Sequence, residues 1–198
     1  MISKSEILFK PLEKEKIEEL KDVVTKPTSI EEIFGLPLKK KEVAENVLPL
    51  DLKVGKIEKV ESHPNAHKLY VLQINFGKEK RQIVSGLKEF YTKEDLENRK
   101  IVAVLNLKSA VIRGIESKGM ILTGEDKNIL GLLSPKKSEP GDQIIPDGYT
   151  LQAKEIDIKQ FSELLLFIKG GKATFEGKPL KTKHEVIEVE RVKEGKIR

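Results

Sequence analysis

The sequence predicts a mainly β protein with a small barrel in the middle of the chain. Five short stretches rich in apolar and β-branched residues suggest strands, near 52–61, 68–76, 81–86, 100–107 and 118–123. Polar or glycine-containing segments separate them, as expected for short strands joined by turns. The segment TKEDLENR (92–99) predicts one inserted helix, with Thr92 as its cap. Residues alone do not distinguish among the small β-barrel folds.

A short helical segment is expected ahead of the barrel, within residues 1–49. The stretch PLEKEKIEELKDVV places Ile17, Leu20 and Val24 near one face of a helix. The segment is too short to form a domain alone, so it either packs on the core or docks another protein. We favour packing on the core, because apolar helical stripes more often serve a chain's own core.

Turn residues in EPGDQIIPDG (139–148) mark the C-terminal end of the barrel in the sequence. An apolar run, a Gly170-Gly171 turn and a partial alternation of apolar and polar residues then predict a β-rich C-terminal extension. The expected division is therefore an N-terminal segment at 1–49, a barrel at 50–148 and an extension at 149–198.

The positive charge of the chain is modest and lies in its two later segments. The net charge is +5, with 17 Lys and Arg against 14 Asp and Glu in residues 50–148, and 11 against 8 in residues 149–198. Residues 1–49 carry 9 Lys and Arg against 10 Asp and Glu. A mildly basic chain binds nucleic acid well only where its cations are gathered in one place.

The segment NLKSAVIRGIESKGM (106–120) gathers such cations where a buried strand leads into a loop. It carries Lys108, Arg113 and Lys118, with Gly114 and Gly119 as flexible points. The alternative interpretation is a basic, solvated loop that closes the barrel. We interpret the segment as a binding edge, because cations, hydroxyls and flexible apolar groups together suit phosphate, sugar and base surfaces.

Catalytic and metal-binding patterns are not evident, and we expect no enzyme, no metal and no cofactor. The chain has no Cys, and Pro64 puts His63 and His67 in a turn, not on a helix. Ser85 lacks the surroundings of a catalytic serine, and Gly114 to Gly119 lacks the ending of a phosphate-binding loop. No apolar run approaches the roughly 20 residues of a membrane span. We therefore expect a soluble, cytoplasmic protein without a membrane partner.

Four strings between residues 50 and 147 resemble a known family. They are VGKI (54–57), HPNAHKLY (63–70), RQIVSGL (81–87) and NLKSAVIRGIESKGM (106–120). They are similar to the tRNA-binding domain appended to methionyl-tRNA and some tyrosyl-tRNA synthetases, also found in stand-alone tRNA-binding proteins and in endothelial monocyte-activating polypeptide. The chain departs from that pattern at His67, Ser109, Val111 and Lys118, and these changes roughly keep the basicity of the edge.

The resemblance implies an OB-fold barrel and a function. The function is sequence-independent, shape-specific tRNA binding, as a cofactor or appended subunit of an aminoacyl-tRNA synthetase, the methionyl enzyme being favoured. We expect tRNA contacts from Lys68, Arg81, Asn106, Lys108, Arg113, Ser117, Lys118 and Met120. Ser117 is expected on the surface, so that its replacement by Ala would spare folding and reduce binding.

The C-terminal extension also carries a resemblance, weaker than that of the barrel. The string ATFEGKPL (173–180) and the ending GKIR are similar to the extension of endothelial monocyte-activating polypeptide. The resemblance implies a pseudo-dimeric monomer, in which residues 149–198 stand in for a second subunit. Two alternatives remain: a protein-binding chaperone on the same barrel, which would carry a Pro-rich and less basic loop, and a cytokine-like or scaffold protein.

Overall fold

The computed structural model describes residues 46–198, so the helical segment expected within residues 1–49 falls outside it except at its end. That end is extended: β1 (Val47–Leu48) pairs in parallel with β12 (Thr150–Leu151). Leu48 and Leu50 are fully buried.

The first barrel forms from the strands that the sequence predicts. They are β2 (Leu52–Ser62), β3 (Tyr70–Asn75), β4 (Lys80–Ser85), β5 (Lys100–Val104) and β8 (Met120–Ile121). β2 pairs with β3 and β5, β3 with β4, and β5 with β8, all antiparallel. Between β4 and β8 the backbone N–H of Lys118 donates to the Gln82 carbonyl at 2.9 Å. The barrel is thus partly open there, and the expected OB-fold in a mainly β chain is confirmed.

The predicted helix is present as a single turn, α3 (Lys93–Leu96), between β4 and β5. Thr92 caps it: its hydroxyl accepts from the Asp95 N–H at 3.2 Å, and the Asp95 carboxylate accepts from the Thr92 N–H at 3.0 Å. The helix ends earlier than residue 99 because the backbone turns away, with Asn98 at a φ of 62°. Buried Leu96 fixes it to the barrel core.

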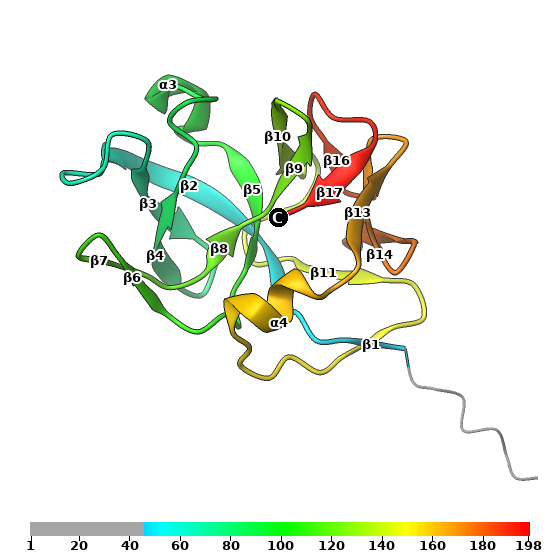
Figure 1. Cartoon of the computed structure of the whole chain (residues 1–198). Helices are drawn as coiled ribbons and strands as arrows, with labels where there is room; N and C mark the ends of the chain where they lie inside the picture. Colours follow the sequence, from blue (N-terminus) through cyan, green and yellow to red (C-terminus); the bar gives the residue numbers. More distant parts are fainter. Residues whose placement is uncertain (1–45) are drawn as a thin grey trace, which may run out of the picture. The chain divides into compact units, whose positions relative to one another are not determined.

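A second closed set of strands, which we call the six-strand ring, lies beside the OB barrel (Figure 1). Its members are β9 (Thr123–Asp126), β10 (Ile129–Ser134), β13 (Leu166–Lys169), β14 (Lys172–Phe175), β16 (Glu188–Val189) and β17 (Gly195–Ile197). Pairing runs β13–β17–β9–β10–β16–β14 and returns to β13. The extension therefore forms its ring together with a hairpin from residues 123–134.

Two further elements join the extension to the barrel. β11 (Gln143–Pro146) pairs with β2 on one side and with β15 (Lys178–Lys181) on the other. Helix α4 (Ile158–Ser162) packs Phe161 into the shared core. Residues 50–148 and 149–198 thus pack together in one compact unit.

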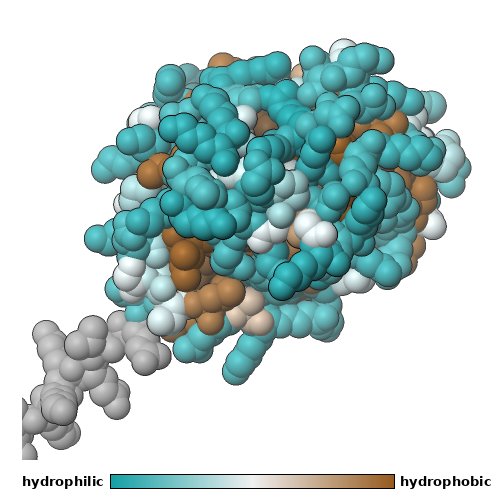
Figure 2. Space-filling model, turned by 180° about the vertical axis from the view of Figure 1, so that it is seen from behind, coloured by the Kyte–Doolittle hydropathy of each residue, from teal (hydrophilic) through white to brown (hydrophobic). Residues whose placement is uncertain are grey.

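β5 separates the two hydrophobic cores. Ile101 and Ala103 belong to the interior of the OB barrel, whereas Val102 and Val104 belong to the core shared with the extension. All four side chains are fully buried. Burial on both faces explains why this stretch is apolar without alternation. The outer surface is mostly hydrophilic, with hydrophobic residues in small separate patches, as Figure 2 shows for the face seen from behind.

Closure of the six-strand ring depends on a glycine. A Cβ at Gly131 of β10 would lie 1.7 Å from the carbonyl oxygen of Glu190. Glu190 in turn donates its N–H to the Leu132 carbonyl at 3.0 Å. Only a residue without a side chain allows the two backbones to approach this closely.

Candidate nucleic-acid interface

The cationic segment forms a β-hairpin that projects from the open side of the OB barrel (Figure 1). β6 (Ala110–Ile112) pairs with β7 (Ile115–Ser117), with Ile112 opposite Ile115. The two residues between them, Arg113 and Gly114, have φ values of 50° and 93°. Two consecutive positive φ angles define the tight turn that matches the twist of a hairpin. Arg113 therefore sits at the tip, where its side chain is exposed.

Hydrogen bonds to β4 hold the base of this hairpin. The Ser117 hydroxyl accepts from the Val84 N–H at 3.0 Å and donates to the Gly119 carbonyl at 3.0 Å. The side-chain amide of Gln82 donates to the Glu116 carbonyl at 2.8 Å. Ser117 is only 3% exposed, so the expected surface position of this residue is wrong. Its hydroxyl is already used inside the protein.

His63 is a positioning residue that sequence reasoning missed. Its ring is buried, and Nδ1 accepts from the Asn65 N–H at 3.1 Å. Nε2 lies 3.1 Å from the Ile112 carbonyl oxygen, so Nε2 carries the proton and donates. The turn after β2 is thereby attached to the hairpin next to its tip. The HP string was visible in the sequence, but its partner 49 residues later was not.

A hollow of about 430 Å³ lies between this turn and the hairpin tip. Asn65, His67, Lys68 and Arg113 line it, together with Ala66 and Leu69. Lys68 also pairs with Glu89 at 2.8 Å, but its side chain remains 71% exposed. An exposed ion pair of this kind is weak, so Lys68 can exchange its partner for another anion. The fold thus brings Lys68 and Arg113 together from distant parts of the sequence.

Two other expected contact residues have their polar groups engaged within the protein. The Arg81 guanidinium donates to the Leu105 carbonyl at 2.6 Å and pairs with Glu79 at 2.9 Å. Asn106 accepts from the Asp51 N–H at 2.8 Å, and its amide nitrogen donates to two backbone carbonyls at 2.7 Å. Both side chains fix the strand ends that carry the edge. Their contact with RNA stays a prediction.

The remaining three expected residues differ in their surroundings. Lys108 is exposed, and only its backbone is engaged, through its N–H and the Ile156 carbonyl at 2.9 Å. Lys118 is exposed and lies 3.4 Å from the Glu116 carboxylate. Met120 is half-buried against the shared core. Among residues 46–198, neither Lys108 nor Arg113 has a carboxylate within ion-pair distance, which leaves their charge for an external anion.

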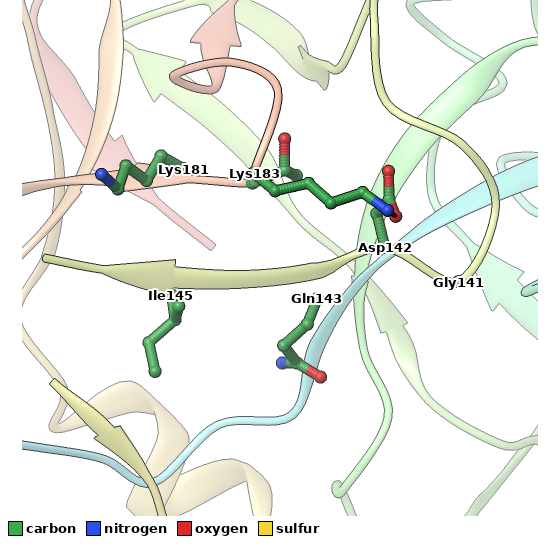
Figure 3. Close-up of a pocket in the computed structure, with 7 residues that line it drawn as sticks. Gly141, Asp142, Gln143, Ile145, Lys181 and Lys183 are labelled. Atoms are coloured by element: carbon green, nitrogen blue, oxygen red, sulfur yellow. Dashed lines mark ion pairs between the residues drawn. The ribbon is translucent and has the colours of Figure 1, made fainter.

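A second hollow with lysines in its lining lies at the junction of the barrel and the extension (Figure 3). It measures about 490 Å³ and includes Lys181 and Lys183. In Figure 3 the Lys183 side chain points to Asp142, and their charged atoms are 3.3 Å apart. Lys181 pairs with Asp147. Both lysines have carboxylate partners here, whereas Lys108 and Arg113 have none within residues 46–198.

Residues 46–198 contain neither a metal-binding cluster nor a helix suited to cross a membrane. Within this range no three His, Asp or Glu side chains gather in a way that could hold a metal ion. No helix of the same range has the length and apolar character needed to cross a membrane.

The partly open barrel and its cationic hairpin place this chain among OB-folds, which commonly bind oligonucleotides. Residues 52–143 match the family model described as "Putative tRNA binding domain", so this part of the chain is a domain of that family. The expected family is confirmed.

The relatives include methionine–tRNA ligases. The one from Thermococcus onnurineus is 50% identical over 93 residues, which is 47% of this chain and 13% of the relative. The one from Borrelia garinii is 36% identical over 192 residues, which is 91% of this chain and 25% of the relative. The chain thus spans a quarter or less of either enzyme.

Among solved structures, the C-terminal domain of Plasmodium vivax p43 is similar to this chain. The TM-score is 0.69 and the identity 29%, over 78% of this chain and 99% of that domain. Since the family model covers less than half of this chain, the similarity to p43 must extend beyond the OB barrel.

Proposed function

We propose that the chain binds tRNA by shape, without regard to sequence, and that the β6–β7 hairpin is the main contact. The observation that supports this most is the charge of Lys108 and Arg113, which no carboxylate of residues 46–198 neutralises. Folded RNA is recognised largely through phosphates, 2′-hydroxyls and exposed bases. A rigid hairpin tip beside a polar hollow suits such contacts, and it needs no base-specific partner.

The roles of the other site residues follow from their partners. Lys68 and Lys118 add charge near the hairpin, each from a weak ion pair with a glutamate. Arg81, Asn106 and Ser117 act chiefly by positioning the edge, because their polar groups are already bonded within the protein. Met120 supplies an apolar contact at the border of the extension.

We further propose that the chain serves an aminoacyl-tRNA synthetase, the methionyl enzyme first, by raising the local concentration of tRNA. The support is its similarity to short parts of methionine–tRNA ligases. Binding of this kind needs no catalysis by the chain itself and takes place in the cytoplasm, where tRNA is charged. We also propose a monomer, since the extension packs against Val102 and Val104 of the barrel.

A binding titration tests the function. We expect several unrelated tRNAs to bind with similar affinity and single- or double-stranded DNA to bind much more weakly. Binding of unfolded proteins in place of tRNA would favour the chaperone alternative, and absence of tRNA binding would exclude the proposal.

Two variants test the hairpin. Lys108→Ala and Arg113→Asn should each weaken the binding of all tRNAs equally. Each should also lower the salt slope, which is the slope of log affinity against log salt concentration, by about one unit. Asn is chosen because it tolerates the positive φ of the turn while it removes the charge. Lys93→Ala, in α3 and outside the hairpin, is the control and should bind as the unaltered chain does. Unchanged binding of both hairpin variants would remove the hairpin from the site.

A further inference from the structure

The outer face of β13 and β17 combines an exposed aromatic ring with lysines. Phe167 of β13 is 43% exposed, although most large apolar side chains of the extension are buried. Lys169, two residues later, is exposed on the same face of the strand. Lys196 of β17 is the residue directly opposite Phe167 in the ladder, so its side chain belongs to the same face.

These three residues line one hollow of about 520 Å³. Neither lysine has a carboxylate within ion-pair distance among residues 46–198. The carboxylates nearby have other partners: Glu194 accepts from the Gly170 N–H at 2.8 Å, and Glu125 pairs with Arg198 at 2.8 Å. The lysines therefore leave positive charge beside an open aromatic face.

The hollow continues toward the OB barrel. Lys196 also lines a neighbouring, more apolar hollow of about 200 Å³, which includes Met120 of β8 and Phe161 of α4. Figure 1 shows β13 and β17 at one end of the described unit and the β6–β7 hairpin at the other. A ligand that contacts both ends must be long, and a folded tRNA is.

We propose that Phe167, Lys169 and Lys196 form a second RNA-contact surface, on which the phenyl ring stacks on an unpaired base and the lysines contact the adjoining phosphates. Aromatic stacking with flanking cations is the usual means of holding single-stranded nucleic acid. The inference rests on the proposed tRNA binding and adds a second point of contact, in the extension. The class of ligand is an unpaired segment of the same tRNA.

Fluorescence can test this surface because the chain contains no Trp. Phe167→Trp introduces a single indole at the proposed stacking position. Addition of tRNA, or of a short single-stranded RNA, should quench its emission. The control is Ile129→Trp, in a different hollow that Glu89 and Glu125 line, and its emission should not change.

Affinity provides the second readout. Phe167→Ala should bind tRNA on the order of tenfold more weakly, and Phe167→Tyr should bind as the unaltered chain does. The double variant Lys169→Gln, Lys196→Gln should lower the salt slope by about two units. Lys127→Gln, in the control hollow, should leave the slope unchanged. Circular dichroism and melting temperature establish that each variant is folded.

The outcomes separate the two proposals. If the unaltered chain does not bind tRNA, the proposed function fails and this inference fails with it. If it binds, but the double lysine variant keeps the full salt slope or Phe167→Ala keeps full affinity, the second surface is overturned while the proposed function stands. Weaker binding by both Phe167→Ala and the double lysine variant, with quenching of the indole emission at position 167 only, supports the inference.

Discussion

The OB barrel and the six-strand ring bury opposite faces of the same strand, β5, yet they are held together by different kinds of contact. Strands β2, β3 and β4 of the barrel follow one another in sequence and pair with their immediate neighbours. In the ring, β9 pairs with β17, so that Glu125 lies opposite Lys196. The barrel depends largely on local pairing, and the ring on contacts between segments far apart in the chain.

Their charges differ as well. The barrel carries the β6–β7 hairpin, and neither Arg113 at its tip nor Lys108 just before it has a carboxylate partner among residues 46–198. The junction lysines Lys181 and Lys183, in contrast, pair with aspartates. Cations at the junction therefore help to join the two regions, and cations at the hairpin are left for a ligand. Similar residue types serve stability in one region and binding in the other.

Truncation after Gly148 should give the largest effect, because it removes four strands of the ring and leaves β9 and β10 paired only with each other. Val102, Val104 and Leu133 would then be exposed. Each buried aliphatic side chain contributes about 1.5 to 3 kcal/mol, so the shortened chain should dimerise or aggregate and lose much of its tRNA affinity. Light scattering should find the full chain monomeric. A full-length dimer, or a shortened monomer that binds normally, would contradict the pseudo-dimer proposal.

Gly131→Ala should disrupt the closure of the six-strand ring without deleting any of its strands. The added Cβ would meet the Glu190 carbonyl, and backbone cannot yield as a flexible side chain can, so we expect a loss of about 1 to 3 kcal/mol in the free energy of unfolding. Gly86→Ala in the barrel is the control, since its Cβ would meet only the Leu69 side chain, at 3.9 Å. Denaturant unfolding of both variants measures the difference. Equal losses would show that the ring does not depend on this close approach.

The carboxylate of Glu185 joins the extension to the loop after β10. It accepts from the N–H groups of Lys136, Lys137 and Ser138 at 3.1, 2.7 and 2.8 Å, and from the Ser138 hydroxyl at 2.8 Å. Burial raises the pKa of this carboxyl, but the hydroxyl and the three N–H groups outweigh it and hold the pKa below its ordinary value. Glu185→Gln should cost about 1 to 2 kcal/mol at neutral pH.

The pH dependence of that loss has a definite sign. The folded pKa is lower than the unfolded one, so the stabilisation is complete above the unfolded pKa, about 4.3, and is lost as the pH falls through the folded pKa. The gap in melting temperature between the unaltered chain and Glu185→Gln should therefore narrow below about pH 4. Glu163→Gln is the control, because that exposed carboxylate has no partner among residues 46–198. A gap that stays constant with pH would contradict this role.

Ser117→Ala should give the smallest effect and tests whether the hairpin base is structural. The Val84 N–H would lose its buried acceptor, so we expect a loss of about 1 kcal/mol in the free energy of unfolding. tRNA affinity should fall only as far as the hairpin is loosened. Ser109→Ala, at an exposed position, should change stability by less than about 0.5 kcal/mol. Full stability of Ser117→Ala together with weaker binding would return Ser117 to direct RNA contact.

The candidate site could be predicted from the sequence in part. Composition and spacing indicated the cationic edge, and the family motifs singled out Lys108 and Arg113. What side chains such as Arg81, Asn106 and Ser117 do could not be read from the motif. Their partners, including Leu105, come from other parts of the chain. A polar residue that contacts RNA looks the same in sequence as one that binds a backbone group of the protein.

The sequence by itself predicted a small β-barrel, because its strands show an apolar pattern and pair mostly with near neighbours, and the family motifs added the choice of an OB-fold. It also determined the cap at Thr92, which depends on local backbone preferences. Only the tertiary structure decided the six-strand ring. Strands such as β16, of two residues, are too short to carry periodicity, and the partners that complete the ring are chosen by packing against Val102 and Val104 across the shared core.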